Sequence, residues 1–435
     1  MISSLRLTPG KKTKTGIVWL LRLLVGATFV MSGLTKCIDL WGVVYKIEEY
    51  FIVWSIDLPL SLYVMTALAL SVSEFLLGLM LLIGSYRRSV PWLLLLMMAF
   101  MLPLSFYIFI ANPVADCGCF GDFLIISNGA TFLKNIFLTV AIVLLIMWNR
   151  QVACLFNPYI QWVPAVAAAV YILAVGMFGY NIQPLVDFRS FPVGTRLAVS
   201  DVDMDDSEDA GSEPQFEFIY EKDGHQASFG ESDLPDSTWT FVDRKLVAGS
   251  VDERTELVVY DGDSEVTEDV IMADEPQLLI VIPDRRRVNI SYTYAINELQ
   301  HCMDSIGGSM IEIAAMPESE INGWRDLSMA TYPIYRAEPT VLKELARGVV
   351  AAVYVEDGKI MWKRSLPSID VDRIAMSENQ QELLRNLSFS GGHLLAVASL
   401  ILFAFYCLVY MLEKSRYLAV WMSKMRPNAR QSEKK

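Results

Sequence analysis

Six apolar runs, each about as long as a membrane-spanning helix, constrain this chain more than any other feature. They lie at residues 16–37, 60–84, 89–111, 132–148, 162–179 and 393–412. Hydrophobic residues make up 53% of the 435 residues, and the charged share is only 20%. So much apolar surface exceeds what one soluble domain can bury. The sequence therefore predicts a polytopic α-helical membrane protein with six transmembrane helices.

Basic residues in the short loops predict how the spans are oriented. Lys and Arg gather in the first fifteen residues, at residues 86–88, at Arg150 and after residue 413. Alternation of six spans puts all of these on one side. We therefore expect a multi-pass protein of the bacterial inner membrane, with both termini in the cytoplasm and residues 181–392 in the periplasm. The first run is about 20 residues long and has no small-residue cleavage site, so we expect it to be a retained helix rather than a signal peptide.

The large region between the fifth and sixth runs divides by composition. Residues 181–275 are acidic and rich in turn formers, which predicts a small β-rich layer with strands at residues 216–220, 238–242 and 256–260. Residues 276–387 alternate strand-like and helix-like segments, then form a hairpin at residues 349–363 and end in a helix at residues 368–387. The expected plan is a basic tail (1–15), a four-helix membrane bundle (16–149), a fifth helix (150–180), the β-rich region (181–275), an α/β domain (276–387), a sixth helix (393–412) and a second basic tail (413–435).

Charge and cysteine spacing exclude several classes of partner and site. The net charge of −13 argues against nucleic acid as a partner. Neither the six cysteines nor the three histidines show the spacing of a zinc site, so we expect no metal. The expected partners are the lipid bilayer and a periplasmic or membrane protein.

Two cysteines two residues apart follow the third apolar run, in Asp116-Cys117-Gly118-Cys119-Phe120-Gly121-Asp122. Thiolate is the reactive form of cysteine, and a pair this close can form a disulfide or pass one to a partner. A ring so small is strained and easily reduced, which favours exchange over a permanent cross-link. The alternative is a glycine-rich turn whose small cysteines only fill space. We predict that Cys117 and Cys119 are catalytic.

The first two spans carry charged residues inside apolar segments. Arg22, Gly26 and Gly33 recur at helical spacing on the first span, and Glu74 lies within the second. A charge in hydrocarbon is costly and normally has a partner, so we expect Glu74 to pair with Arg22. This pair either locks the bundle, or Glu74 serves as a proton or quinone-head partner.

The outer end of the first span adds a further thiol. Lys36 and Cys37 are expected at the outer surface, level with the cysteine pair, where the ammonium of Lys36 would lower the pKa of a nearby thiol. Cys37 either attacks the pair as a third thiol or only lines its helix. Residues 38–54 mix aromatic and charged residues, which predicts a helix in the membrane interface, as a lid over the thiols.

The remaining cysteines and one basic run have less specific readings. Cys154, Cys302 and Cys407 are predicted to be packing residues, because free cysteine behaves as a small hydrophobe. The triple arginine at residues 285–287 is either a solvated turn or a binding patch for an acidic partner or lipid head groups.

The first four spans resemble the DoxX/MauE group of small membrane proteins. The likeness rests on Arg22, Gly33 and Lys36, on Glu74, and on Cys-Gly-Cys-Phe-Gly at residues 117–121, which points to the MauE side. It covers about a third of the chain. The resemblance implies a four-helix redox-associated bundle linked to disulfide formation or to electron transfer with quinone.

Residues 276–387 resemble the thioredoxin-like fold of the TlpA type in the order of their elements. That family has a Cys-x-x-Cys after the first strand, and residues 283–287 hold Pro-Asp-Arg-Arg-Arg instead. The family's proline before the hairpin strand is replaced by Arg347-Gly348-Val349. We therefore expect a DoxX/MauE-like bundle plus two helices, a cysteine-less extracytoplasmic thioredoxin-like domain and a β-rich insertion.

Two functions from different classes follow from these features. The first is an inner-membrane redox protein that performs thiol–disulfide exchange or quinone-linked electron transfer, with Cys117, Cys119, Cys37 and Glu74 as site residues and a membrane quinone as the candidate cofactor. Its thioredoxin-like domain would dock a partner without catalysis. The alternative is a non-enzymatic membrane-anchored scaffold or assembly factor for another envelope protein.

Overall fold

The computed structural model describes residues 11–111, 118, 120–124, 126–148, 154–197, 215–222, 225–230, 240–248, 256–271 and 275–425. The chain divides into two compact units, and each is described by itself. The first contains Met1–Arg189, Ala346–Ala352 and Lys363–Lys435, and the second contains Ser190–Leu345 and Val353–Trp362.

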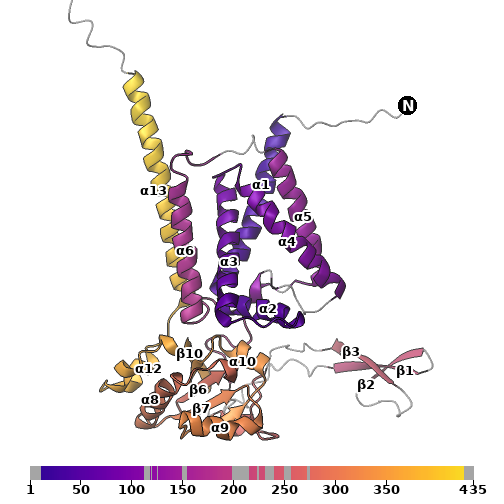
Figure 1. Ribbon diagram of the computed structural model, residues 1–435, viewed down its shortest axis with the longest axis vertical. Helices are drawn as coiled ribbons and strands as arrows, with labels where there is room; N and C mark the ends of the chain where they lie inside the picture. The colour runs from indigo at the N-terminus through magenta and orange to yellow at the C-terminus, as the bar shows by residue number, and fades with distance from the viewer. Residues whose placement is uncertain are drawn as a thin grey trace, which may run out of the picture. The chain divides into compact units, whose positions relative to one another are not determined.

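Six helices of the described chain are long and apolar enough to cross a membrane, as predicted. All belong to the first unit (Figure 1). They are α1 (Lys11–Ile38), α3 (Leu60–Ile83), α4 (Val90–Ala111), α5 (Asn128–Met147), α6 (Trp162–Asn181) and α13 (Gly391–Met425). Their length and hydropathy make the protein a multi-pass membrane protein.

Helices α1 and α3 pack so closely that glycine is required where they meet. A Cβ atom on Gly33 would lie 2.4 Å from the backbone nitrogen of Phe75, and one on Gly78 would lie 2.7 Å from that of Val30. Both distances are well below the non-bonded contacts that Cβ atoms make in proteins, so these two positions have no room for a side chain. Because residues late in α1 contact residues early in α3, the two helices run antiparallel.

A short helix, α2 (Leu40–Val53), follows α1, as predicted for residues 38–54. Asp39 caps its first turn by accepting a hydrogen bond from the Gly42 amide at 3.0 Å. Trp41 stacks on Tyr180 at 5.2 Å between ring centroids and donates its indole N–H to the Tyr180 carbonyl. These contacts hold α2 against the end of α6.

Helix α13 lies beside α6 (Figure 1). The hydroxyl groups of Tyr171 and Ser399 are 2.8 Å apart, and Tyr406 donates to the Pro164 carbonyl at 2.6 Å. The fifth and sixth spans therefore form a pair joined by hydrogen bonds.

A seven-stranded mixed sheet is the framework of the α/β region, with strand order β10-β9-β6-β7-β8-β4-β5. Its strands are β4 (Tyr260–Asp261), β5 (Ser264–Glu265), β6 (Gln277–Ile282), β7 (Ser309–Ala314), β8 (Ile334–Arg336), β9 (Ala351–Glu356) and β10 (Lys359–Ser365). Strands β6, β7 and β8 are parallel. Every residue of β6 is buried, as expected for a central strand covered on both faces.

Helices α8 (Tyr292–Ser305), α9 (Glu318–Ser328) and α10 (Pro339–Leu345) alternate with strands β6 to β9, as predicted. A short helix, α7 (Thr267–Val270), precedes β6 and was not predicted. The prediction of one helix at residues 368–387 is wrong, because α11 (Val371–Ala375) and α12 (Gln380–Arg385) occupy that range. Asn379 accepts a hydrogen bond from the Glu382 amide and so starts a new helix there.

A separate three-stranded antiparallel sheet lies within the predicted β-rich region. Its order is β2-β1-β3, built from β1 (Gln215–Lys222), β2 (His225–Gly230) and β3 (Thr240–Ala248). Two of the three predicted strands, at residues 216–220 and 238–242, correspond to β1 and β3. The third, at residues 256–260, reaches strand geometry only at β4.

Candidate functional site

The predicted catalytic residues Cys117 and Cys119 lie outside the described residues, but parts of their loop are described. Gly118 and Gly121 have φ angles of +64° and +56°, a region that glycine enters without steric cost. Gly118, between the two cysteines in the chain, lies against Lys46 of α2, since a Cβ there would be 3.2 Å from the Lys46 Cγ. The predicted helix at residues 38–54 therefore contacts the thiol-bearing loop.

Asp122, at the end of the cysteine motif, is held by an arginine from a distant part of the chain. It lies in a single 3₁₀ turn, η1 (Gly121–Phe123), and pairs with the guanidinium of Arg347. The same guanidinium contacts Asp39, with 2.8 Å from Nη2 to Oδ2 and 3.0 Å from Nε to Oδ2. Arg347 thus joins two carboxylates, one at the start of α2 and one in the thiol loop.

The two carboxylates are in different electrostatic environments. Burial would raise the pKa of Asp39, but the charges of Arg347 and Arg189 hold it below the ordinary value for an aspartate. Burial raises the pKa of Asp122 despite the pairing with Arg347. Asp39 therefore stays charged, and Asp122 is the member of the trio that protonates more easily.

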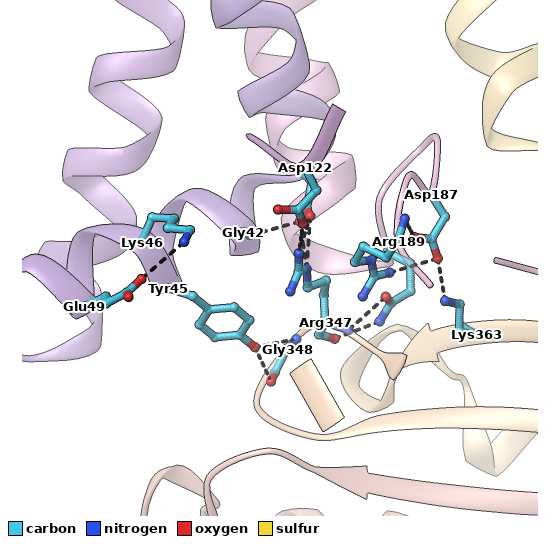
Figure 2. A network of polar contacts seen from close by, with 12 residues as sticks. Gly42, Tyr45, Lys46, Glu49, Asp122, Asp187, Arg189, Arg347, Gly348 and Lys363 are labelled. Atoms are coloured by element: carbon cyan, nitrogen blue, oxygen red, sulfur yellow. Dashed lines mark hydrogen bonds and ion pairs between the residues drawn. The ribbon is translucent and has the colours of Figure 1, made fainter. Parts of the chain in front are cut away.

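The backbone around Arg347 is fixed as firmly as its side chain. Gln183 donates from Nε2 to the Arg347 carbonyl at 2.7 Å and accepts from the Arg347 amide at 3.1 Å. Tyr45 of α2 donates to the Gly348 carbonyl at 3.2 Å and accepts from the Gly348 amide at 3.3 Å (Figure 2). Burial raises the pKa of the Tyr45 hydroxyl to about 12, so it remains protonated and can donate.

A second ionic group continues this network. Asp187 accepts from Arg189, with 2.7 Å from Oδ1 to Nε, and also pairs with Lys363 (Figure 2). Burial lowers the pKa of Lys363 to about 8, with the charge of Arg189 adding to the effect. The combined network of Asp39, Asp122, Asp187, Arg189, Arg347 and Lys363 balances three acidic against three basic side chains. Such balance is what allows so many charges to be buried together.

Within the membrane bundle, Glu74 pairs with Lys36. The Lys36 Nζ atom lies 2.7 Å from Oε2 and 2.8 Å from Oε1, and the Ser32 hydroxyl donates to Oε2 at 2.7 Å. Both charged side chains are buried, with 6% and 5% of their surface exposed. The prediction that Lys36 lies at the outer surface is therefore wrong, because its side chain is buried in the bundle.

The predicted pairing of Arg22 with Glu74 is also wrong. Arg22 donates from Nε to the Leu81 carbonyl at 2.7 Å and from Nη2 to the Leu82 carbonyl at 2.5 Å. The cause is the glycine-determined register, which brings Arg22 level with the far end of α3 and Lys36 level with Glu74. Arg22 thus satisfies carbonyl groups at the end of α3.

Cys37 is a free thiol with no exposed surface. It packs against α6, since a Cβ on Gly176 would lie 3.6 Å from its sulfur atom. An attack on the cysteine pair would require these helices to part, so the structure agrees better with the predicted helix-lining role.

The other cysteines differ from one another. Cys302 is buried, as predicted. Cys154 is exposed, so its predicted packing role is wrong; it lies before α6 in a segment without helical structure. Cys407 is half-buried on α13. In the part of the chain with described structure, no group of three or more His, Cys, Asp or Glu side chains could hold a metal ion.

The triple arginine forms the single turn η4 (Arg285–Arg287) after β6. Arg286 and Arg287 pair with Asp284 at 3.1 and 3.3 Å, and the Arg286 side chain is 88% exposed. Arg285 instead stacks on Trp324, 3.4 Å from the ring centroid. The solvated-turn reading therefore describes Arg286, whereas Arg285 is part of the domain's packing.

Sequence reasoning missed the role of Arg347 and of its two carboxylate partners. Arg347 and Asp39 are separated by 308 positions, and no local pattern reports a contact at that range. The available signals were indirect: Asp122 closes the cysteine motif, and Arg347-Gly348-Val349 departs from the pattern that the expected thioredoxin-like resemblance would require.

Comparison with known proteins identifies two segments. Residues 214–248 match a family described as a domain of unknown function (DUF8463), which corresponds to the three-stranded sheet. No curated protein and no solved structure matches the chain. Residues 14–148 match the family described as Methylamine utilisation protein MauE. The chain is thus a multi-pass membrane protein that is similar to MauE over its first four candidate spans.

Proposed function

We propose that the protein is a membrane-bound thiol redox protein in which Cys117 and Cys119 exchange disulfides with a partner protein. The observation that supports this most is the anchoring of their loop. Gly118 lies against Lys46 of α2, and Asp122 is held by the buried Arg347. A mere space-filling turn would not need a buried arginine from 225 positions away to hold it.

The proposed reaction is a two-step exchange. A disulfide between Cys117 and Cys119 is attacked by a partner's thiolate, which forms a mixed disulfide and releases one thiol of the pair. The partner's second thiolate then attacks the mixed disulfide, which leaves the partner oxidised and the Cys117–Cys119 pair as two thiols. The reverse sequence reduces the partner. The electron acceptor or donor that restores the pair is a further membrane component.

A quinone in contact with Glu74 fits this geometry poorly. Both carboxylate oxygens of Glu74 already accept from Lys36, one of them also from Ser32, and the side chain is almost fully buried between α1 and α3. The arrangement supports the bundle-locking role for this pair, so no step of the mechanism passes through Glu74.

For the sheet domain we propose a thioredoxin-like docking module. Four neighbouring strands in the order β7-β6-β9-β10, with β6 and β7 parallel and α8 between them in sequence, support that fold. The turn after β6 carries arginine in place of cysteine. Such a domain can bind a partner but cannot exchange disulfides there.

We place the sheet domain and the cysteine loop in the periplasm of a bacterial inner membrane protein, with both termini in the cytoplasm. The distribution of Lys and Arg in the short loops supports this orientation. An oxidising compartment is also where exchanging disulfides belong.

A non-enzymatic scaffold is the second candidate, favoured by the absence of cysteine from the turn after β6. The variant in which Cys117 and Cys119 are both serine distinguishes the redox protein from the scaffold. With a reduced or oxidised glutathione buffer, the full-length protein should interconvert between dithiol and disulfide forms, and the single variant Cys119→Ser should trap a partner as a mixed disulfide. A scaffold would retain its partner in the double serine variant and lose it when Arg286 is changed to glutamate.

A further inference from the structure

We propose that Arg347 is the positioning residue of the thiol loop: by binding Asp39 and Asp122 together, it holds the described part of that loop, Gly118 and Gly121–Phe123, against α2. The inference rests on the proposed function for its biological meaning. The contact itself is a feature of the first unit, because Ala346–Ala352, α2 and η1 all belong to that unit.

The geometry around the guanidinium is that of a built site. Arg347 is 3% exposed, and it engages Asp39 through both Nε and Nη2. Its Nη2 atom also reaches Asp122, and its Cζ atom lies 5.4 Å from the centre of the Tyr45 ring. Planar arginine suits this task better than lysine, because its fixed fork can serve two carboxylates at once.

Hydrogen bonds to the main chain hold residues 347 and 348 in place in addition to the ion pairs. Gln183 bonds both polar backbone atoms of Arg347, and Tyr45 bonds both of Gly348. Gly348 has a φ angle of +119°, which a residue with a side chain rarely adopts. The guanidinium therefore loses little freedom when it binds the two carboxylates.

Electrostatics predict what happens without Arg347. Asp39 and Asp122 then face one another with the charges of Arg189 and Lys46 as partial compensation, and each raises the energy of the other's charged form. Asp122 is the more exposed of the two, with 29% of its side-chain surface accessible against 9% for Asp39. The loop end should move away from α2, because Asp39 is fixed as the cap of that helix.

The test is the rate at which Cys117 and Cys119 of the reduced full-length protein in lipid nanodiscs react with a maleimide, followed peptide by peptide. Arg347→Gln should raise the rate roughly fivefold or more, which corresponds to the coupling expected within one ionic network. Asp122→Asn should also raise the labelling rate. The double variant Arg347→Gln with Asp122→Asn should react no faster than Arg347→Gln alone. Arg347→Lys keeps the positive charge but not the fork, so it should restore only part of the protection, whereas a merely space-filling role would make Arg347→Lys and Arg347→Gln equivalent.

Arg364→Gln is the matched control, since this arginine of β10 donates to the Leu387 carbonyl and stacks on Phe389 rather than binding a carboxylate of the loop. An unchanged rate in Arg347→Gln, or an equal increase in Arg364→Gln, would overturn the proposal. If Arg347→Gln fails to fold, Asp122→Asn against wild type decides alone. The rates are measured on reduced thiols, so they are independent of whether the pair exchanges disulfides, and a failure of the proposed function would show instead as a pair that never oxidises.

Discussion

Lys36 of α1 and Glu74 of α3 form a buried ion pair in which Nζ and Oε2 are 2.7 Å apart. The pair lies where α1 and α3 pack closely, near the position where Gly33 meets Phe75. Two charges in an apolar bundle are tolerable because each neutralises the other and Ser32 satisfies a further lone pair.

Removing one partner of this pair should be far more harmful than removing both. Glu74→Ala is expected to reduce the free energy of unfolding by about 3–5 kcal/mol, because it leaves the Lys36 ammonium buried and unpaired. The double variant Lys36→Met with Glu74→Met should recover most of that loss. Detergent-based unfolding of the wild type and these two variants measures both effects. Equal destabilisation by the single and double variants would contradict the bundle-locking role.

The close contact of α1 and α3 gives a second prediction. Gly33→Ala should destabilise the protein by about 1–3 kcal/mol, because the added carbon meets the rigid backbone of Phe75 at 2.4 Å. Gly16→Ala, on the same helix, is the matched control, since nothing lies within 4 Å of its added carbon. Thermal unfolding in one detergent compares the two. A Gly33→Ala protein as stable as Gly16→Ala would show that the helices are farther apart than described.

A buried glutamate should make the sheet domain sensitive to pH. Burial raises the pKa of Glu312 from 4.5 to about 7, even though its carboxylate accepts from the Trp324 indole at 2.6 Å. The folded state therefore binds a proton more tightly than the unfolded state does. The contribution to stability is complete below pH 4.5 and is lost as the pH rises to about 7, with a total of about 3 kcal/mol.

Urea unfolding of the full-length protein, followed by tryptophan fluorescence, tests this dependence. The urea midpoint of the wild type should decrease as the pH rises from 5 to 8, a range that includes the pKa of about 7. The midpoint of Glu312→Gln should change little over this range, and this variant should be the more stable protein at pH 8. The half-exposed Glu318, which pairs with Arg336, supplies the control variant Glu318→Gln. A wild-type slope equal to that of Glu312→Gln would refute the assignment.

The cysteines outside the pair should differ widely in reactivity. Cys154 is exposed, whereas Cys37 and Cys302 are buried, so maleimide should label Cys154 in the folded protein at least roughly tenfold faster than the other two. Mass spectrometry of tryptic peptides gives the three rates. Rapid labelling of Cys37 would mean that α1 and α6 separate readily.

Much of the architecture followed from local patterns. Hydrophobic run length located the six spans, and strand–helix alternation located β6 to β10, because both signals depend on neighbouring residues alone. The restart of the helix at Asn379 was missed, since a single capping side chain decides it. The exposure of Cys154 was missed because burial is a tertiary property.

The site was predicted less well than the fold. The partner of Glu74 depends on the register between α1 and α3. Contacts of the glycines set this register, and no pattern in a single sequence reports those contacts. The Asp39–Arg347–Asp122 network joins three segments far apart in the chain. Only the motif at residues 117–122 indicated where in the bundle to look.

The most direct test of the account is the redox state of Cys117 and Cys119 in living cells. Thiols are trapped with a mass tag before and after exposure to an oxidant, in wild type and in the variant with both cysteines changed to serine. The account predicts that the pair passes between dithiol and disulfide forms and that this shift is absent from the double variant. A pair that stays reduced under every condition would contradict it.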